Sequence, residues 1–173
     1  MNNNALILGA LALAVALAIG GGGYMIYSQN AEDAANEKKY APLIAQTEAA
    51  NGIPAGLLHR QLYEESHYRA DIISGATPSS VGALGIAQFM PDTARSLGID
   101  PTDPLQAIPA AGRYMKSLYN DTRSWSMALA AYNWGIGNVL AYIRTGLGAH
   151  GQSMPSQTNA YVADITGALP GVA

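Results

Sequence analysis

Apolar residues recur at three- and four-residue intervals along most of the chain after residue 40, which is the spacing of amphipathic helices. The pattern predicts helices over residues 41–50, 54–66, 91–97, 105–119 (or 109–119), 126–132, 138–144 and 158–165. Asn51-Gly52, Gly98 and Gly135 are typical of the ends of such helices. Few segments alternate as strands do, so the predicted fold is mainly α, with at most a small hairpin in the loop at residues 67–83.

Residues 5–27 follow a different pattern, because they contain no charged side chain. At 1.5 Å per residue a helix over this range would be about 35 Å long, enough to cross a hydrocarbon core of about 30 Å. The stretch therefore predicts one N-terminal transmembrane helix, with Tyr24 and Tyr27 at the membrane interface. The glycine run at residues 20–23 lowers helix propensity, although small residues also permit close helix packing in lipid.

A cleavable signal peptide is the alternative interpretation of this stretch, because residues 16–18 (ALA) resemble a cleavage site. The first four residues lack the Lys or Arg of a signal peptide, and the apolar run is longer than usual, so an uncleaved anchor is favoured. The predicted organisation is an anchor at residues 1–27, a polar linker with helical tendency at 28–39 and one domain over 40–173.

Composition narrows the range of partners and cofactors. The net charge is only −3, and no Lys/Arg cluster exceeds Lys38-Lys39, so no nucleic-acid partner is expected. The chain has no cysteine, which excludes disulfides and thiolate metal sites. The three histidines, His59, His67 and His150, lack the spacing of metal ligands. We predict neither a metal nor a cofactor.

The segment PAGLLHRQLYEES, residues 54–66, carries the main candidate for acid–base chemistry. Leu58, Leu62 and Glu65 fall at i, i+4 and i+7, so the carboxylate continues the apolar face of the predicted helix. Burial and the negative end of the helix dipole both raise the pKa of such a group. This spacing does not exclude Glu64, and the helix alone is more typical of a surface glutamate. The assignment therefore depends on the segments downstream.

Two further blocks follow in a defined order: GIAQFMP at residues 85–91, with Thr-Ala at 93–94, and AAYNWG at residues 130–135. Together with Glu65-Ser66, they resemble the motifs of the lytic transglycosylases of the soluble (SLT) type, which have a goose-type-lysozyme-like fold. The segment at residues 157–162 is similar to the Glu-Thr…Tyr-Val segment that closes the family domain, with Gln157 in place of Glu. The resemblance covers about residues 40–165, and three ordered blocks are far more specific than any one alone.

The resemblance implies an enzyme that cleaves the MurNAc–GlcNAc β-1,4 bond of peptidoglycan glycan strands and leaves a 1,6-anhydro ring on MurNAc. Glu65 matches the catalytic acid, and Ser66 matches the partner that orients the acid or the substrate. Gln88 matches the glutamine that lines the cleft, and Asn133 the asparagine that contacts the sugar. Tyr132 matches the tyrosine whose hydroxyl lies near the acid.

Two other functions stay open: a muramidase, which would hydrolyse the same bond on the same fold, and a non-catalytic wall-binding membrane protein. The polar residues present in all three blocks argue against the non-catalytic wall-binding protein. A muramidase of the usual kind needs a second carboxylate, and Asp71 in the loop is the main candidate, ahead of Glu64 and Asp92. Trp134 replaces the small residue common in the family, and its two roles, stacking on a sugar or covering the core, remain open.

The implied substrate lies outside the cytoplasmic membrane. We therefore expect the domain on the periplasmic or cell-wall side, although Lys38-Lys39 weakly favours the cytoplasm. A small domain on a single anchor would suit a phage virion enzyme, an accessory of a secretion or conjugation machine, or a bacterial wall-remodelling enzyme.

Overall fold

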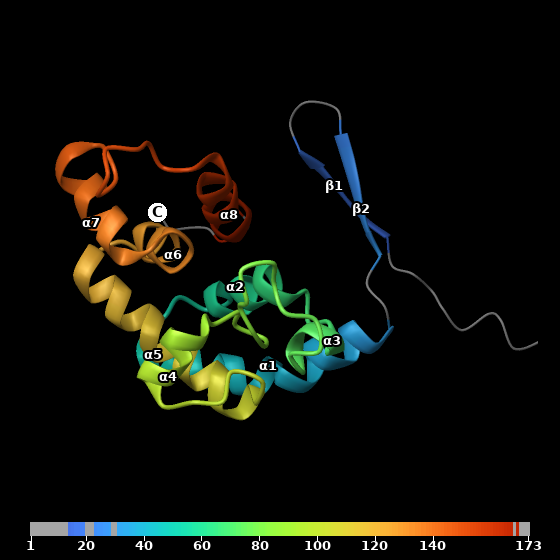
Figure 1. Cartoon of the computed structure of the whole chain (residues 1–173). Helices are drawn as coiled ribbons and strands as arrows, with labels where there is room; N and C mark the ends of the chain where they lie inside the picture. The colour runs from blue at the N-terminus through green and yellow to red at the C-terminus, as the bar shows by residue number, and fades with distance from the viewer. Residues whose placement is uncertain (1–13, 20–22, 29–30, 168, 170–173) are drawn as a thin grey trace, which may run out of the picture.

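The computed structural model describes residues 14–19, 23–28, 31–167 and 169, and its described helices all lie within residues 31–167 (Figure 1). They are α1 (Ala31–Asn51), α2 (Leu57–Ser66), α3 (Ala70–Ile73), α4 (Pro91–Leu97), α5 (Pro104–Thr122), α6 (Trp125–Trp134), α7 (Ile136–Thr145) and α8 (Ser156–Thr166). The strands β1 (Ala14–Ile19) and β2 (Gly23–Ser28) precede them as an antiparallel pair, with Ala14 opposite Ser28. The prediction of a mainly helical protein is confirmed.

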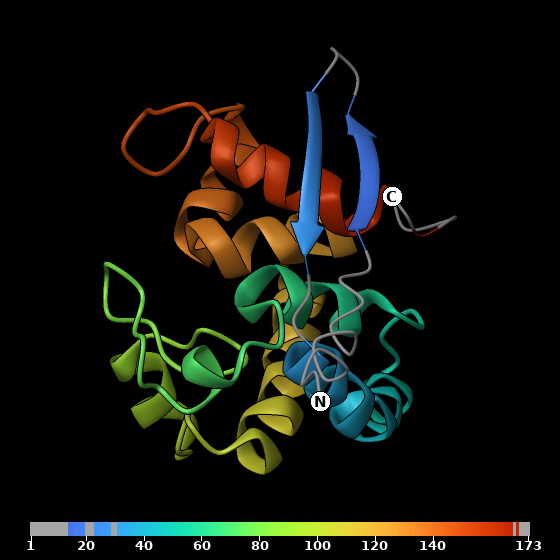
Figure 2. The ribbon, with the colours of Figure 1, turned by 90° about the vertical axis from the view of Figure 1, so that its right-hand side faces the viewer.

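The helices form two groups with α2 between them (Figures 1 and 2). Helices α6, α7 and α8 lie in one group and α1, α3 and α4 in the other, while α5 runs from one group to the other. Helix α2 contacts α1 on one side and α8 on the other. Helix α6 contacts α5, α7 and α8, and its residues 128–131 are all buried, as their small apolar side chains allow.

One hydrophobic core joins both groups through α2. Leu58 and Leu62 of α2 are fully buried, together with Ile108 of α5 and Leu129 of α6. Full burial of such a side chain stabilises a fold by about 1.5–3 kcal/mol. The core therefore holds α2 firmly, and the position of any residue on α2 is set by both groups of helices.

The N-terminal segment differs from the predicted transmembrane helix over residues 5–27. Residues 14–19 and 23–28 form strands, and the rest of that range, residues 5–13 and 20–22, lies outside the described residues. The glycines at 20–23 disfavour a continuous helix, and the flanking Val, Ile and Tyr residues have high strand propensity. Among the described residues, no helix is both long enough and apolar enough to cross a membrane.

Helix α1 begins ten residues earlier than predicted, since the stretch expected as a linker at residues 28–39 is helical from Ala31 onward. Glu32 and Asp33 in its first turn favour a helix start through the dipole. The Asn36 amide also donates to the carbonyl of Tyr68 at 3.1 Å, which ties this part of α1 to the end of α2. The other predicted helices are confirmed within a few residues, and the loop at 67–83 contains the short helix α3.

Candidate active site

Glu65 lies in the last turn of α2, on the helix face that the sequence predicts. Leu58 and Leu62 on this face are fully buried, whereas Glu65 keeps part of its surface open to solvent. The predicted apolar face is therefore confirmed, and the carboxylate lies where that face reaches the surface. An acid in this position is accessible to a ligand and is also shielded from bulk water.

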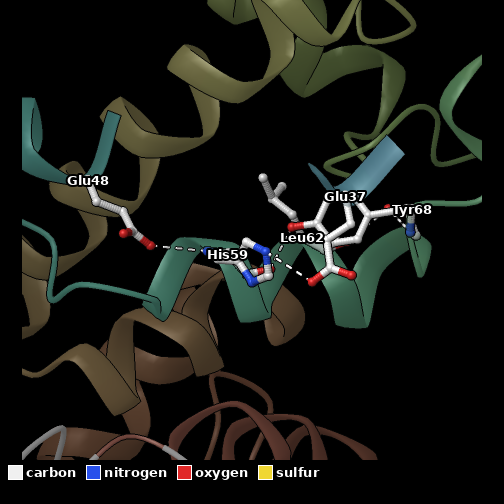
Figure 3. Close-up of polar contacts among 6 residues, drawn as sticks. Glu37, Glu48, His59, Leu62 and Tyr68 are labelled. Atoms are coloured by element: carbon white, nitrogen blue, oxygen red, sulfur yellow. Dashed lines mark hydrogen bonds and ion pairs between the residues drawn. The ribbon is translucent and has the colours of Figure 1, made fainter. Parts of the chain in front are cut away.

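A buried carboxylate of α1 holds the first turn of α2. Glu48 is only 5% exposed, and its two oxygens accept hydrogen bonds from the backbone N–H groups of Gly56 (2.9 Å) and His59 (3.1 Å). These N–H groups belong to the start of the helix, where no intrahelical acceptor exists. Glu48 thus replaces the missing cap, and Figure 3 shows its contact with His59.

The other end of α2 is closed by Ser66 and Tyr68, and Figure 3 shows Tyr68 at this end of the helix. The Ser66 hydroxyl donates to the carbonyl of Leu62 at 2.9 Å and accepts from the N–H of Tyr68 at 3.1 Å. The Tyr68 hydroxyl donates to the carbonyl of His59 at 2.9 Å, so the chain folds back along the helix. His67 and Tyr68 both have positive φ, which ends the helix directly after the Glu65 turn.

Ser66 was predicted to orient the acid or to bind the substrate, and the geometry separates these two roles. Its side chain is fully buried, and its hydroxyl is occupied by the two backbone contacts. A ligand would not reach it without opening the end of α2. The position of Ser66 therefore favours the first role, in which it holds the turn that carries Glu65.

The Glu65 carboxyl is largely enclosed by protein, and this loss of hydration raises its pKa from the ordinary 4.5 to about 7. The hydrogen bond from Tyr161 acts in the opposite direction and lowers the pKa, while the charge of Glu64 raises it. The Tyr161 hydroxyl on α8 donates to Oε1 of Glu65 at 2.6 Å. Glu65 can therefore both release and accept a proton near neutral pH.

Tyr161 is the residue that the predicted set of site residues missed. Its pKa lies well above the ordinary value because its hydroxyl is removed from water and faces the Glu65 carboxylate, so it stays a neutral donor. The available signal in the sequence is the Tyr-Val pair at residues 161–162, which resembles the segment that closes the family domain.

The Tyr132 hydroxyl bonds to the loop that carries Gln88 and not to the Glu65 carboxyl. Burial is the main cause that raises the pKa of Tyr132, and the charge of Glu65 is the second. The Tyr132 hydroxyl donates to the carbonyl of Ala87 at 2.7 Å, which joins α6 to the GIAQFMP block. Its ring lies 5.9 Å from that of Phe89. Tyr132 thus connects the second and third sequence blocks beside the acid.

The loop that carries Gln88 is tightly closed. Leu84 and Phe89 exchange two backbone hydrogen bonds at 3.0 and 3.1 Å, and Gln88 itself has φ +46°. The Gln88 amide donates to the carbonyl of Gly85 at 3.0 Å. A Cβ at Gly85 would lie 1.7 Å from the carbonyl oxygen of Pro101, so only glycine fits there. The loop therefore holds the partly exposed Gln88 side chain in a defined place.

Asn133 and Trp134 follow Tyr132 at the end of α6. Asn133 is exposed, and its side-chain carbonyl accepts from the Thr158 hydroxyl at 2.8 Å, which directs the amide N–H groups to other partners. Trp134 packs edge-on against Tyr142, and a Cβ at Gly148 would lie 2.6 Å from its ring. The structure thus assigns Trp134 to covering α7 and the loop that follows it.

The candidate second carboxylates in the loops have partners of their own. Asp71 accepts two hydrogen bonds from the Arg69 guanidinium, at 3.2 and 2.7 Å. Hydrogen bonds from Thr77 and Arg69 hold the pKa of Asp71 below its usual value. Asp92 is exposed and pairs with Arg95 at 2.6 Å. Neither carboxylate shares the enclosed environment of Glu65.

Glu64 is the carboxylate adjacent to Glu65, and it faces α8. Partial burial and the charge of Asp164 raise the pKa of Glu64, while Arg60 lowers it. Arg60 also donates to the backbone carbonyl of Asp164 at 2.7 Å. Within the part of the chain that the structure describes, no group of three or more His, Asp or Glu side chains could hold a metal ion.

The comparisons with known proteins identify the family to which the domain that carries this site belongs. The family model described as the transglycosylase SLT domain matches residues 42–152, which include Glu65 and both later blocks. The membrane-bound lytic murein transglycosylase F of Alcanivorax borkumensis is 35% identical over 109 residues, covering 58% of this chain and 22% of that protein. The protein of the same name from Maricaulis maris is 37% identical over 92 residues, which cover 48% of this chain and 19% of that protein. The chain spans about a fifth of the length of these curated relatives.

Proposed function

Because the chain belongs to the transglycosylase SLT family, we propose that it is a lytic transglycosylase that cleaves the MurNAc–GlcNAc β-1,4 bond of peptidoglycan. The names of the relatives, which describe murein transglycosylases, support this substrate. The proposed product is a glycan strand that ends in 1,6-anhydro-MurNAc, so the reaction opens the cell wall locally without consuming water.

Glu65 is the proposed catalytic acid and base. In its protonated form it donates to the oxygen that links the two sugars, and the bond from C1 of MurNAc to that oxygen breaks. The resulting carboxylate then takes the proton of the C6 hydroxyl of the same MurNAc, whose oxygen forms the new bond to C1. One carboxyl group performs both steps, and a pKa of about 7 suits both directions of proton transfer at neutral pH.

The observation that carries this proposal is the enclosed carboxyl of Glu65 with its hydrogen bond from Tyr161. A retaining glycosidase needs a second carboxyl about 5–5.5 Å from the first, and an inverting one needs it about 6.5–9.5 Å away. Asp71 and Asp92 are each paired with their own arginine. This arrangement supports a mechanism with one carboxylate.

The remaining predicted residues have proposed roles in holding the glycan. In this proposal Gln88 binds sugar substituents with its amide, and the hydrogen bond from that amide to Gly85 supports a fixed side chain. Asn133 offers amide N–H donors, because the Thr158 hydroxyl occupies its side-chain carbonyl. Tyr132 connects the Gln88 loop to α6, and Ser66 keeps the Glu65 turn in place. These roles predict that changes at Gln88 and Asn133 affect substrate binding more than protein stability.

Mass spectrometry of the muropeptides that the full chain releases from purified sacculi tests the proposed function. We expect 1,6-anhydro-MurNAc ends, and no release by Glu65→Gln, which has the same shape but cannot transfer a proton. Reducing MurNAc ends would instead identify a muramidase. Binding to sacculi without release of muropeptides would identify a wall-binding protein.

We further propose that residues 5–27 attach the domain to a membrane, with the domain on the cell-wall side. The uncharged, apolar composition of this segment and the word "membrane-bound" in the names of the relatives support the proposal. Carbonate extraction of membranes should leave the full chain in the pellet and release a chain that begins at Asn30. Full release of both chains, or a mature N-terminus near Ile19, would contradict it.

A further inference from the structure

Gln61 is a buried polar residue that the mechanism above does not use. It lies on α2 one turn before Glu65, and its side chain is fully buried. Neither its Oε1 nor its Nε2 makes a hydrogen bond of ordinary geometry to another described residue. An unpaired buried amide destabilises a fold, so an apolar side chain would serve the core better here. This mismatch points to a task at the neighbouring site.

The surroundings of Gln61 identify its nearest polar partner. Residues four apart on a helix share a face, so Gln61 and Glu65 both face α8. The Gln61 amide lies close enough to the Tyr161 hydroxyl to lower the pKa of that tyrosine, as an N–H donor does. The Tyr161 hydroxyl uses its hydrogen for Oε1 of Glu65, so its lone pairs remain to accept from Nε2 of Gln61.

We propose that Gln61 is a positioning residue for the reaction, whose amide N–H holds the Tyr161 hydroxyl in the orientation that donates to Glu65. This inference rests on the proposed function of Glu65. A hydroxyl that accepts one hydrogen bond is a stronger donor in the next, so the amide strengthens the bond from Tyr161 to the carboxylate. Gln61 thereby favours the ionised form of Glu65, in opposition to burial.

Other titratable groups can also affect the pKa values of Glu65 and Tyr161. They lie on α2, α5, α6 and α8 and are Arg60, Glu64, Tyr114, Tyr132 and Asp164. Gln61 carries no charge, so it can influence Glu65 only through Tyr161. The Gln61→Met variant isolates this influence, because Met has nearly the same shape and removes both polar atoms. It leaves all five surrounding groups unchanged.

The experiment compares the full-length wild type with Gln61→Met in the pH dependence of muropeptide release and in thermal unfolding. We expect the initial rate to fall about fivefold at neutral pH, as for loss of one hydrogen bond in the transition state. In the plot of rate against pH, the rate falls on the alkaline side as Glu65 loses its proton. This fall, the alkaline limb, should move to higher pH, because the carboxylate form of Glu65 has lost a stabilising hydrogen-bond network. The melting temperature should stay about the same, because the lost contact with Tyr161 is offset by removal of the buried Oε1 atom, which has no hydrogen-bond partner among the described residues.

Repeating the Gln61→Met change in a Tyr161→Phe variant tests whether Gln61 acts through the Tyr161 hydroxyl. In Tyr161→Phe, which lacks the hydroxyl, adding Gln61→Met should change neither the rate nor the alkaline limb further. The proposal fails if Gln61→Met leaves the alkaline limb in place, or if it has the same effect in both backgrounds. Reducing ends or no release by the wild type would instead refute the proposed function, so the two failures are distinguishable.

Discussion

Replacing Glu65 by Gln should stabilise the folded protein at alkaline pH and leave its stability unchanged in acid. In the folded state the pKa of Glu65 is raised from 4.5 to about 7, so the folded protein holds this proton more tightly than the unfolded chain does. Ionisation of Glu65 therefore lowers the free energy of unfolding as the pH rises from 4.5 to about 7. Below this window both states are protonated, and the effect of Glu65 disappears.

The size of the effect follows from the pKa. A change from 4.5 to about 7 corresponds to an upper limit of about 3 kcal/mol above neutral pH. The Glu65 side chain is partly exposed, so solvent screening reduces this value, and we expect a gain of about 1–3 kcal/mol for Glu65→Gln. The new amide oxygen can still accept from Tyr161, so the variant keeps that hydrogen bond.

Urea unfolding of the full-length wild type and variant, at about pH 4 and about pH 8, measures this difference in the free energy of unfolding. Asp71→Asn is the matched control with the opposite sign, since the pKa of Asp71 lies below its usual value. That variant should lose stability above the unfolded pKa and match the wild type in strong acid. If Glu65→Gln and the wild type have the same free energy of unfolding at about pH 8, burial of Glu65 does not raise its pKa.

Three further predictions concern the surroundings of the site. Glu48→Ala removes the acceptor for two N–H groups at the start of α2 and should lower the free energy of unfolding by about 2–3 kcal/mol in urea titrations. Gly85→Ala should destabilise by more than 3 kcal/mol, because a Cβ meets the backbone of Pro101. Gly82→Ala, with positive φ but open space, should cost only about 1 kcal/mol in the same titration. Asp71→Asn should release muropeptides at the wild-type rate, and a loss of tenfold or more would favour a muramidase.

The sequence by itself determined the helical fold and the candidate acid. Helix periodicity is a local property, so the spacing of Leu58, Leu62 and Glu65 already placed the carboxylate on the inner face of α2. The order of the three blocks pointed to the family that the comparisons support. The N-terminal prediction did not hold in the described strands, because an uncharged run of Ala, Val, Ile and Tyr is compatible with both a helix and strands.

Only the tertiary structure decided which groups surround Glu65. Tyr161 is separated from it by 96 positions along the chain, and the packing of α8 on α2 brings the two together. The same packing brings Tyr161 beside Gln61, and the approach of α1 lets Glu48 cap α2. Burial also sets the pKa of Glu65. These properties arise from contacts between segments far apart in the chain, and no spacing within one segment encodes them.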